Sequence, residues 1–164
     1  MTRRKEIAMR SSDLSIIAIA LTTALAVPTL AAAQRQHAAA LGDLMTAFVQ
    51  PRHIKLGLAG NAQNWVYAGY ELDQLRETLA DVAEILPKYR DLSIPDMIES
   101  TVKAPLAALS VAIQAKDGNL FNTAYRQLTA ACNTCHRGYD RAEIVIQSPT
   151  VTEFSDQDFR PSTK

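Results

Sequence analysis

Both cysteines of the 164-residue chain lie in one five-residue segment, Cys132-Asn133-Thr134-Cys135-His136. In a helix, residues three positions apart lie about one turn from each other on the same face. Two thiols placed in this way can reach the two vinyl groups on one porphyrin edge, and the adjacent imidazole can bind the iron. The spacing is the attachment signature of c-type haem. It predicts one covalent haem c, held by Cys132 and Cys135, with His136 as an axial ligand of the iron.

Three other uses of these cysteines fit the sequence less well. A thioredoxin-like dithiol is expected within a β-α-β unit, which the sequence does not suggest. A structural zinc site needs four ligands, whereas the segment supplies three and no second cluster of Cys and His completes the set. A disulfide across two residues would close too small a loop to stabilise the fold much.

Four helical segments are predicted to position this motif. The clearest is 65–86, where apolar residues recur at alternating spacings of three and four and acidic residues such as Glu71 fall outside the apolar seam. Pro51 and Pro105 are expected to kink or interrupt the helices that contain them. Ser93 and Asp96 resemble a capping box, and Asp117-Gly118-Asn119 marks a helix end and restart. The segments are 37–60, 65–86, the run from Ser93 to Asp117, and 120–139.

These segments predict an all-α fold. Four helices with short connections in about 105 residues favour an antiparallel four-helix bundle, which we expect to bind haem and to span residues 34–142. Residues 143–164 contain Pro149 and Pro161 among scattered Ser and Thr, and they predict an extended C-terminal tail.

The N-terminal residues predict export. Arg3, Arg4, Lys5 and Arg10 precede an apolar stretch at 14–30, which ends in Ala31-Ala32-Ala33. This order is typical of a secretory signal peptide, here residues 1–33, and predicts a periplasmic protein. An uncleaved membrane anchor is the alternative, although the apolar stretch is shorter than the about 20 residues that span a bilayer. No later stretch is apolar enough to cross a membrane.

The charge balance excludes some partners. The chain has 17 basic and 17 acidic residues, which argues against a dedicated nucleic-acid-binding protein. Removing residues 1–33 takes away four basic and two acidic residues, leaving 13 against 15, a net charge of −2. That charge is too small to identify a partner surface.

The predicted helices and the position of the motif resemble the cytochrome c′ family, the class II c-type cytochromes, over residues 36–140. The resemblance is strongest in the last helix, which ends with the motif followed by Arg137-Gly138-Tyr139. It implies a haem between the first and last helices. The family often has a basic residue after the tyrosine, where this chain has Asp140. A homodimer is a further expectation from the resemblance, with Trp65 and Tyr67 either at the contact or in the core.

The sixth iron ligand distinguishes two functions. His53 shares an apolar stripe with Met45 and is one candidate, Met45 is another because low-spin members of the family use a first-helix methionine, and the position can also be open. Two axial ligands predict one-electron transfer with a redox partner protein. An open apolar site predicts a five-coordinate haem protein that binds NO or CO. Because no second group of acid–base residues is visible, we do not expect an enzyme.

Overall fold

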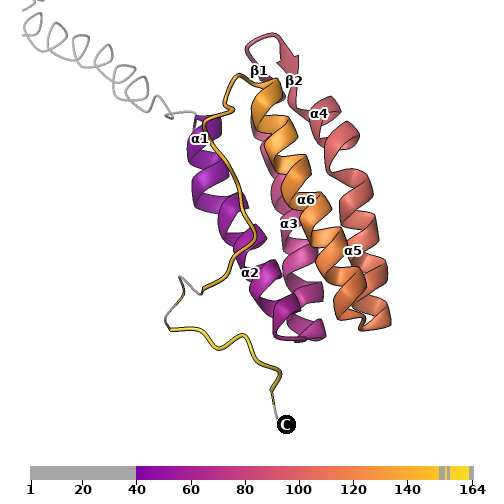
Figure 1. Cartoon of the computed structure of the whole chain (residues 1–164). Helices are drawn as coiled ribbons and strands as arrows, with labels where there is room; N and C mark the ends of the chain where they lie inside the picture. Colours follow the sequence, from indigo (N-terminus) through magenta and orange to yellow (C-terminus); the bar gives the residue numbers. More distant parts are fainter. Residues whose placement is uncertain (1–39, 152–153, 155, 163–164) are drawn as a thin grey trace, which may run out of the picture. The chain divides into compact units, whose positions relative to one another are not determined.

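The computed structural model describes residues 40–151, 154 and 156–162, so the predicted signal peptide at 1–33 lies outside the described residues. The described chain is mostly helical, which confirms the prediction of helix (Figure 1). One short antiparallel pair of strands is an addition that the sequence did not predict. Within this part of the chain, no helix combines the length and the apolar character needed to cross a membrane.

The first helical run passes through Pro51 without ending. It begins with α1 (Leu41–Leu44), continues as the π-helix η1 (Met45–Val49) and becomes α2 (Gln50–Asn61), with Pro51 in the first turn of α2. Proline has no N–H, so a continuous helix loses one main-chain hydrogen bond at Pro51. The change from π-helix to α-helix therefore takes up the interruption predicted at Pro51.

The seam predicted for the second helix is confirmed in α3 (Trp65–Ile85), but Glu71 is not outside the core. The side chain of Glu71 is only 1% exposed, and its Oε2 lies 3.2 Å from Nη1 of Arg52 on α2. A buried carboxylate needs such a partner, so Arg52 explains how Glu71 fits between the two helices. The buried seam residues are Ala68, Leu72, Leu75, Leu79 and Val82.

The third predicted helix is two helices. After the strands β1 (Lys88–Tyr89) and β2 (Leu92–Ser93), the Ser93 hydroxyl accepts a hydrogen bond from the Asp96 N–H and caps α4 (Ile94–Thr101), as predicted. The next helix, α5 (Lys103–Ala115), carries Pro105 in its first turn. A proline ring clashes with the carbonyl four residues earlier, which belongs to Thr101, so α4 ends there.

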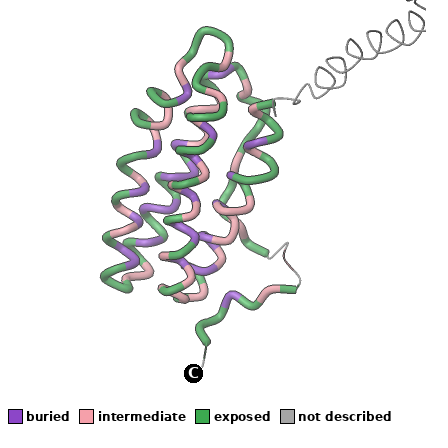
Figure 2. The backbone as a smooth tube through the Cα atoms, turned by 180° about the vertical axis from the view of Figure 1, so that it is seen from behind, coloured by how far each residue is buried: buried purple, intermediate pink, exposed green. Residues whose placement is uncertain are grey.

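The last helix, α6 (Gly118–Gly138), begins at the predicted restart. The carboxylate of Asp117 caps it by accepting the N–H groups of Asn119 and Leu120 at 2.8 and 3.0 Å. Helix α2 packs against α3 and α6, and α5 packs against α3 and α6, so the four lie side by side (Figure 1). Buried residues recur along each of them (Figure 2).

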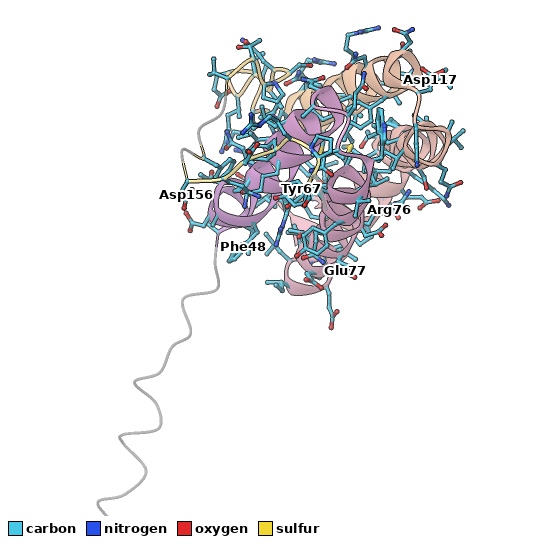
Figure 3. The ribbon with its side chains drawn as sticks, turned by 90° about the horizontal axis from the view of Figure 1, so that it is seen from below. Phe48, Tyr67, Arg76, Glu77, Asp117 and Asp156 are labelled. Carbon is cyan, nitrogen blue, oxygen red and sulfur yellow. The ribbon has the colours of Figure 1, made fainter. Side chains whose placement is uncertain are left out.

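The described residues of the C-terminal tail have no regular secondary structure, but they are bound to the helices. The tail runs along α2 (Figure 1), where the Lys55 ammonium lies 4.6 Å from the centre of the Phe154 ring. The Asn64 amide donates to the carbonyls of Phe159 and Arg160 at 3.2 and 3.1 Å. Phe159 is buried and its ring centre lies 5.8 Å from that of Tyr67, whereas Asp156 lies at the edge of the molecule (Figure 3).

Candidate haem-binding site

An apolar cavity lies among the first helical run, α4, the C-terminal end of α6 and the tail. Cys132, Cys135 and His136 all line it, and so do the two candidates for the sixth ligand, His53 and Met45. The structure therefore brings the predicted site residues around one space, although they come from segments far apart in the sequence. The apolar part of the wall includes Leu41, Val49, Ile94, Ile98, Ile144 and Ile146.

The two cysteines are free, partly buried thiols one turn apart on α6. Burial raises the pKa of Cys132 to about 12, with a smaller contribution from the nearby Cys135, and burial raises the pKa of Cys135 to about 11. Both thiols are therefore protonated at neutral pH. Redox-active dithiols lower the pKa of a cysteine to form a thiolate, so this environment does not favour a redox-active dithiol.

His136 is oriented by the main chain of the tail. Its Nδ1 lies 2.7 Å from the carbonyl oxygen of Ile144. Because a carbonyl can only accept, Nδ1 of the neutral ring carries the proton and Nε2 keeps its lone pair. Metal-binding histidines commonly use this arrangement, with one nitrogen donating to a carbonyl and the other binding the metal. Two thiols and this imidazole together fit a covalently attached haem.

The iron at such a site would rely on the porphyrin for most of its ligands. In the described part of the chain, no three side chains of His, Cys, Asp or Glu are grouped so that they could hold a metal ion. A haem brings four nitrogen ligands of its own, so one histidine is enough to complete a five-coordinate site.

His53 is buried, at 3% exposure, and both of its ring nitrogens have partners on α6. Nε2 lies 3.1 Å from the Thr129 hydroxyl oxygen, and Nδ1 lies 3.0 Å from the Tyr125 hydroxyl oxygen. The Tyr125 and Thr129 hydroxyl oxygens also lie 2.7 and 2.9 Å from main-chain carbonyl oxygens. Because each hydroxyl has one proton, the hydroxyl that donates to the unprotonated ring nitrogen cannot donate to its carbonyl at the same time. Binding of iron by His53 would break one of these bonds.

Burial of His53 predicts a pH-dependent stability, because it lowers the pKa of the ring from 6.5 to about 4. Between these values the unfolded chain binds a proton here that the folded chain does not, so stability is fully present above pH 6.5 and falls as the pH drops through this window. We expect the free energy of unfolding to decrease by about 1.4 kcal/mol per pH unit from this group alone. Denaturant unfolding at several pH values measures this slope.

The variant His53→Phe is the control for this prediction. It removes the titrating ring, while the Tyr125 and Thr129 hydroxyls keep their main-chain acceptors. The free energy of unfolding of wild type minus that of the variant should therefore decrease as the pH falls from about 6.5 to about 4. A constant difference across this range would contradict the burial of a neutral His53.

Met45 is the other candidate for the sixth ligand. It belongs to η1 and is partly buried at the cavity wall. A thioether is a weak hydrogen-bond acceptor and needs no deprotonation, so its binding to iron gives up less than binding by His53 would. Short π-helical turns are frequent at functional sites, which agrees with the position of Met45.

The cavity has a polar edge that the sequence did not predict. Arg141 Nη2 donates to the Tyr89 hydroxyl at 3.0 Å, and both residues line the cavity. The resemblance predicts a basic residue directly after Tyr139, where this chain has Asp140. The basic residue that lines the cavity is Arg141, one position later. The signal in the sequence is a basic residue two positions after Tyr139.

Comparisons with family models, with curated proteins and with solved structures found no match for this chain.

Proposed function

We propose that the chain is an exported c-type cytochrome that carries one haem c in an antiparallel four-helix bundle and transfers single electrons. The observation that supports it is the placement of Cys132, Cys135 and His136 at one apolar cavity, with His136 in the tautomer suited to metal binding. The resemblance to the cytochrome c′ family, periplasmic localisation after cleavage behind Ala33, and a redox partner protein belong to the same proposal.

The residues of the cavity have separable roles in this proposal. Cys132 and Cys135 would hold the haem, each by adding its sulfur and its hydrogen across one vinyl double bond, so attachment would need no oxidant and would release no leaving group. When bound, the haem supplies an iron that accepts and releases one electron. Arg141 and Tyr89 give the cavity a polar edge that would suit the carboxylates of the haem, while the apolar wall would keep water from the iron.

A five-coordinate protein that binds NO or CO is the second candidate function. It is favoured by the hydrogen bonds that occupy both nitrogens of His53 and by the apolar wall, which would admit small uncharged gases. The two functions differ in the state of the sixth position of the iron. That position can be observed directly by absorption spectroscopy.

The full chain, produced in cells that assemble c-type cytochromes, tests the proposal. We expect an intact mass equal to the mature polypeptide plus one haem, and a Soret band that remains after denaturation. A low-spin ferric spectrum that CO does not change after reduction would support electron transfer, whereas a high-spin spectrum with rapid CO binding would support the gas-binding function. A bare polypeptide mass without a Soret band would refute both.

Replacement of Met45 by Leu identifies the sixth ligand. Leu keeps the size of the side chain but removes the sulfur, so Met45→Leu should convert a low-spin spectrum to high-spin and open the iron to CO. Met97→Leu is the matched control, because Met97 is also partly buried but is not among the residues that line the cavity. An unchanged spectrum in Met45→Leu, together with a high-spin spectrum in His53→Phe, would assign the position to His53 instead.

A further inference from the structure

The tail residues 144–146, which we call the strap, are joined to α6 by a pair of hydrogen bonds. The Asn133 amide Nδ2 donates to the Ile146 carbonyl at 2.9 Å, and the Ile146 N–H donates to Asn133 Oδ1 at 2.7 Å. One side chain thus satisfies both main-chain groups of one tail residue. This pairing fixes the position of the strap along α6 as well as its distance from it.

The same strap reaches His136. Asn133 and His136 are three residues apart on α6 and share a face of the helix. In an extended segment, residues two positions apart present the same side. Ile146 therefore meets Asn133 while the Ile144 carbonyl meets His136 Nδ1 at 2.7 Å. Ile144 and Ile146 both line the cavity.

The turn after α6 directs the strap toward His136, and a contact between Pro149 and α2 holds the chain beyond the strap. Asp140 adopts a left-handed conformation with a φ of 54°, and the Arg141 N–H donates to the His136 carbonyl at 2.8 Å, which reverses the chain after α6. Beyond the strap, Pro149 packs against Gly57 of α2 so closely that a Cβ there would lie 2.9 Å from its ring. The strap is therefore tethered on both sides.

We infer that the strap sets the orientation and the donor strength of the axial histidine, and that Asn133 is the positioning residue that holds the strap. This inference rests on the proposed function, because it concerns the histidine that would bind the iron. Asn133 acts through Ile146 and Ile144. A hydrogen bond from Nδ1 to a carbonyl makes the imidazole a stronger electron donor, which favours ferric iron and lowers the reduction potential.

Two variants of one tail residue test the inference outside the attachment motif. Ile146→Pro removes the N–H that Asn133 accepts, whereas Ile146→Ala keeps the main-chain bonds and removes only the apolar side chain. In the haem-loaded chain, we expect Ile146→Pro to shift the ratio of reduced to oxidised iron about tenfold toward the reduced form, about 59 mV upward for one electron. The exchange of the His136 Nδ1 proton with solvent, followed by NMR, should become at least about tenfold faster. Ile146→Ala should keep the wild-type exchange rate.

A second pair of variants keeps the test decisive if Ile146→Pro does not fold. Asn133→Leu removes both bonds and should reproduce the two shifts, while Asn133→Asp keeps the acceptor and should give smaller ones. Asn122→Leu, at an exposed position of the same helix, is the matched control. Loaded Asn133→Leu and Ile146→Pro chains with the potential and the exchange rate of wild type would overturn this inference alone. A wild-type chain without haem would overturn the proposed function, and this inference with it.

Discussion

Replacing both Cys132 and Cys135 with Ser is expected to abolish covalent attachment of haem. The hydroxyl of serine does not add to the vinyl groups under conditions in which a thiol does, so the purified variant should have the mass of the bare polypeptide. Serine is close in volume to cysteine, and both positions are only partly buried, so the helix should form as before. Intact mass, combined with extraction of any non-covalent haem into acidified organic solvent, measures the result.

The single variants test whether both sulfurs take part. Cys132→Ser and Cys135→Ser should each retain haem through the remaining thioether, with a lower yield and with the spectrum of a haem that keeps one vinyl group. Thr134→Ser, at an exposed position inside the motif, is the control and should load like wild type. A double variant that still carries haem after extraction would place the attachment elsewhere.

Features that depend on neighbouring residues in the sequence could be predicted. The cap at Ser93 and the helix restart at Asp117-Gly118-Asn119 depend on residues close in the sequence, and the structure confirms both. The buried seam of α3 follows from helical periodicity alone. The thiol pair is likewise local, because its geometry is set by one turn of α6.

Features that depend on long-range contacts could not be predicted. The burial of Glu71 depends on its partner Arg52, which is 19 residues away on another helix. His53 is a plausible ligand when only its own stripe is considered, and its partners Tyr125 and Thr129 lie 72 and 76 residues away.

The tail is a third such case. Its Pro, Ser and Thr content predicts an extended chain and says nothing of where that chain binds. The contact with His136 is made by the main-chain carbonyl of Ile144, which any residue type would supply. Asn133 is the one residue whose type suggests a bound main-chain segment, because its amide can both donate to and accept from a backbone. It lies at a position where the motif allows any residue.

Gly60→Ala is expected to destabilise the protein by about 1–3 kcal/mol, although alanine is the better helix former. A Cβ at Gly60 would lie 2.0 Å from the ring of Phe121 on α6, so one of the two helices must move. The ring itself is fully buried, with its centre 6.0 Å from that of Trp65 and 5.8 Å from that of Tyr125, and it has no room to turn away.

Gly69→Ala is the matched control, since a Cβ there meets only Ile113 at an ordinary 3.8 Å, and it should stabilise α3 by about 0.5–1 kcal/mol. Thermal unfolding of the two variants beside wild type measures both effects, with opposite shifts of Tm expected. Because Phe121 stacks on Tyr125, and Tyr125 holds His53 at the cavity, Gly60→Ala should also disturb the His53 network. Equal stability of the two variants would contradict the close approach of α2 to α6 at Gly60 and Phe121.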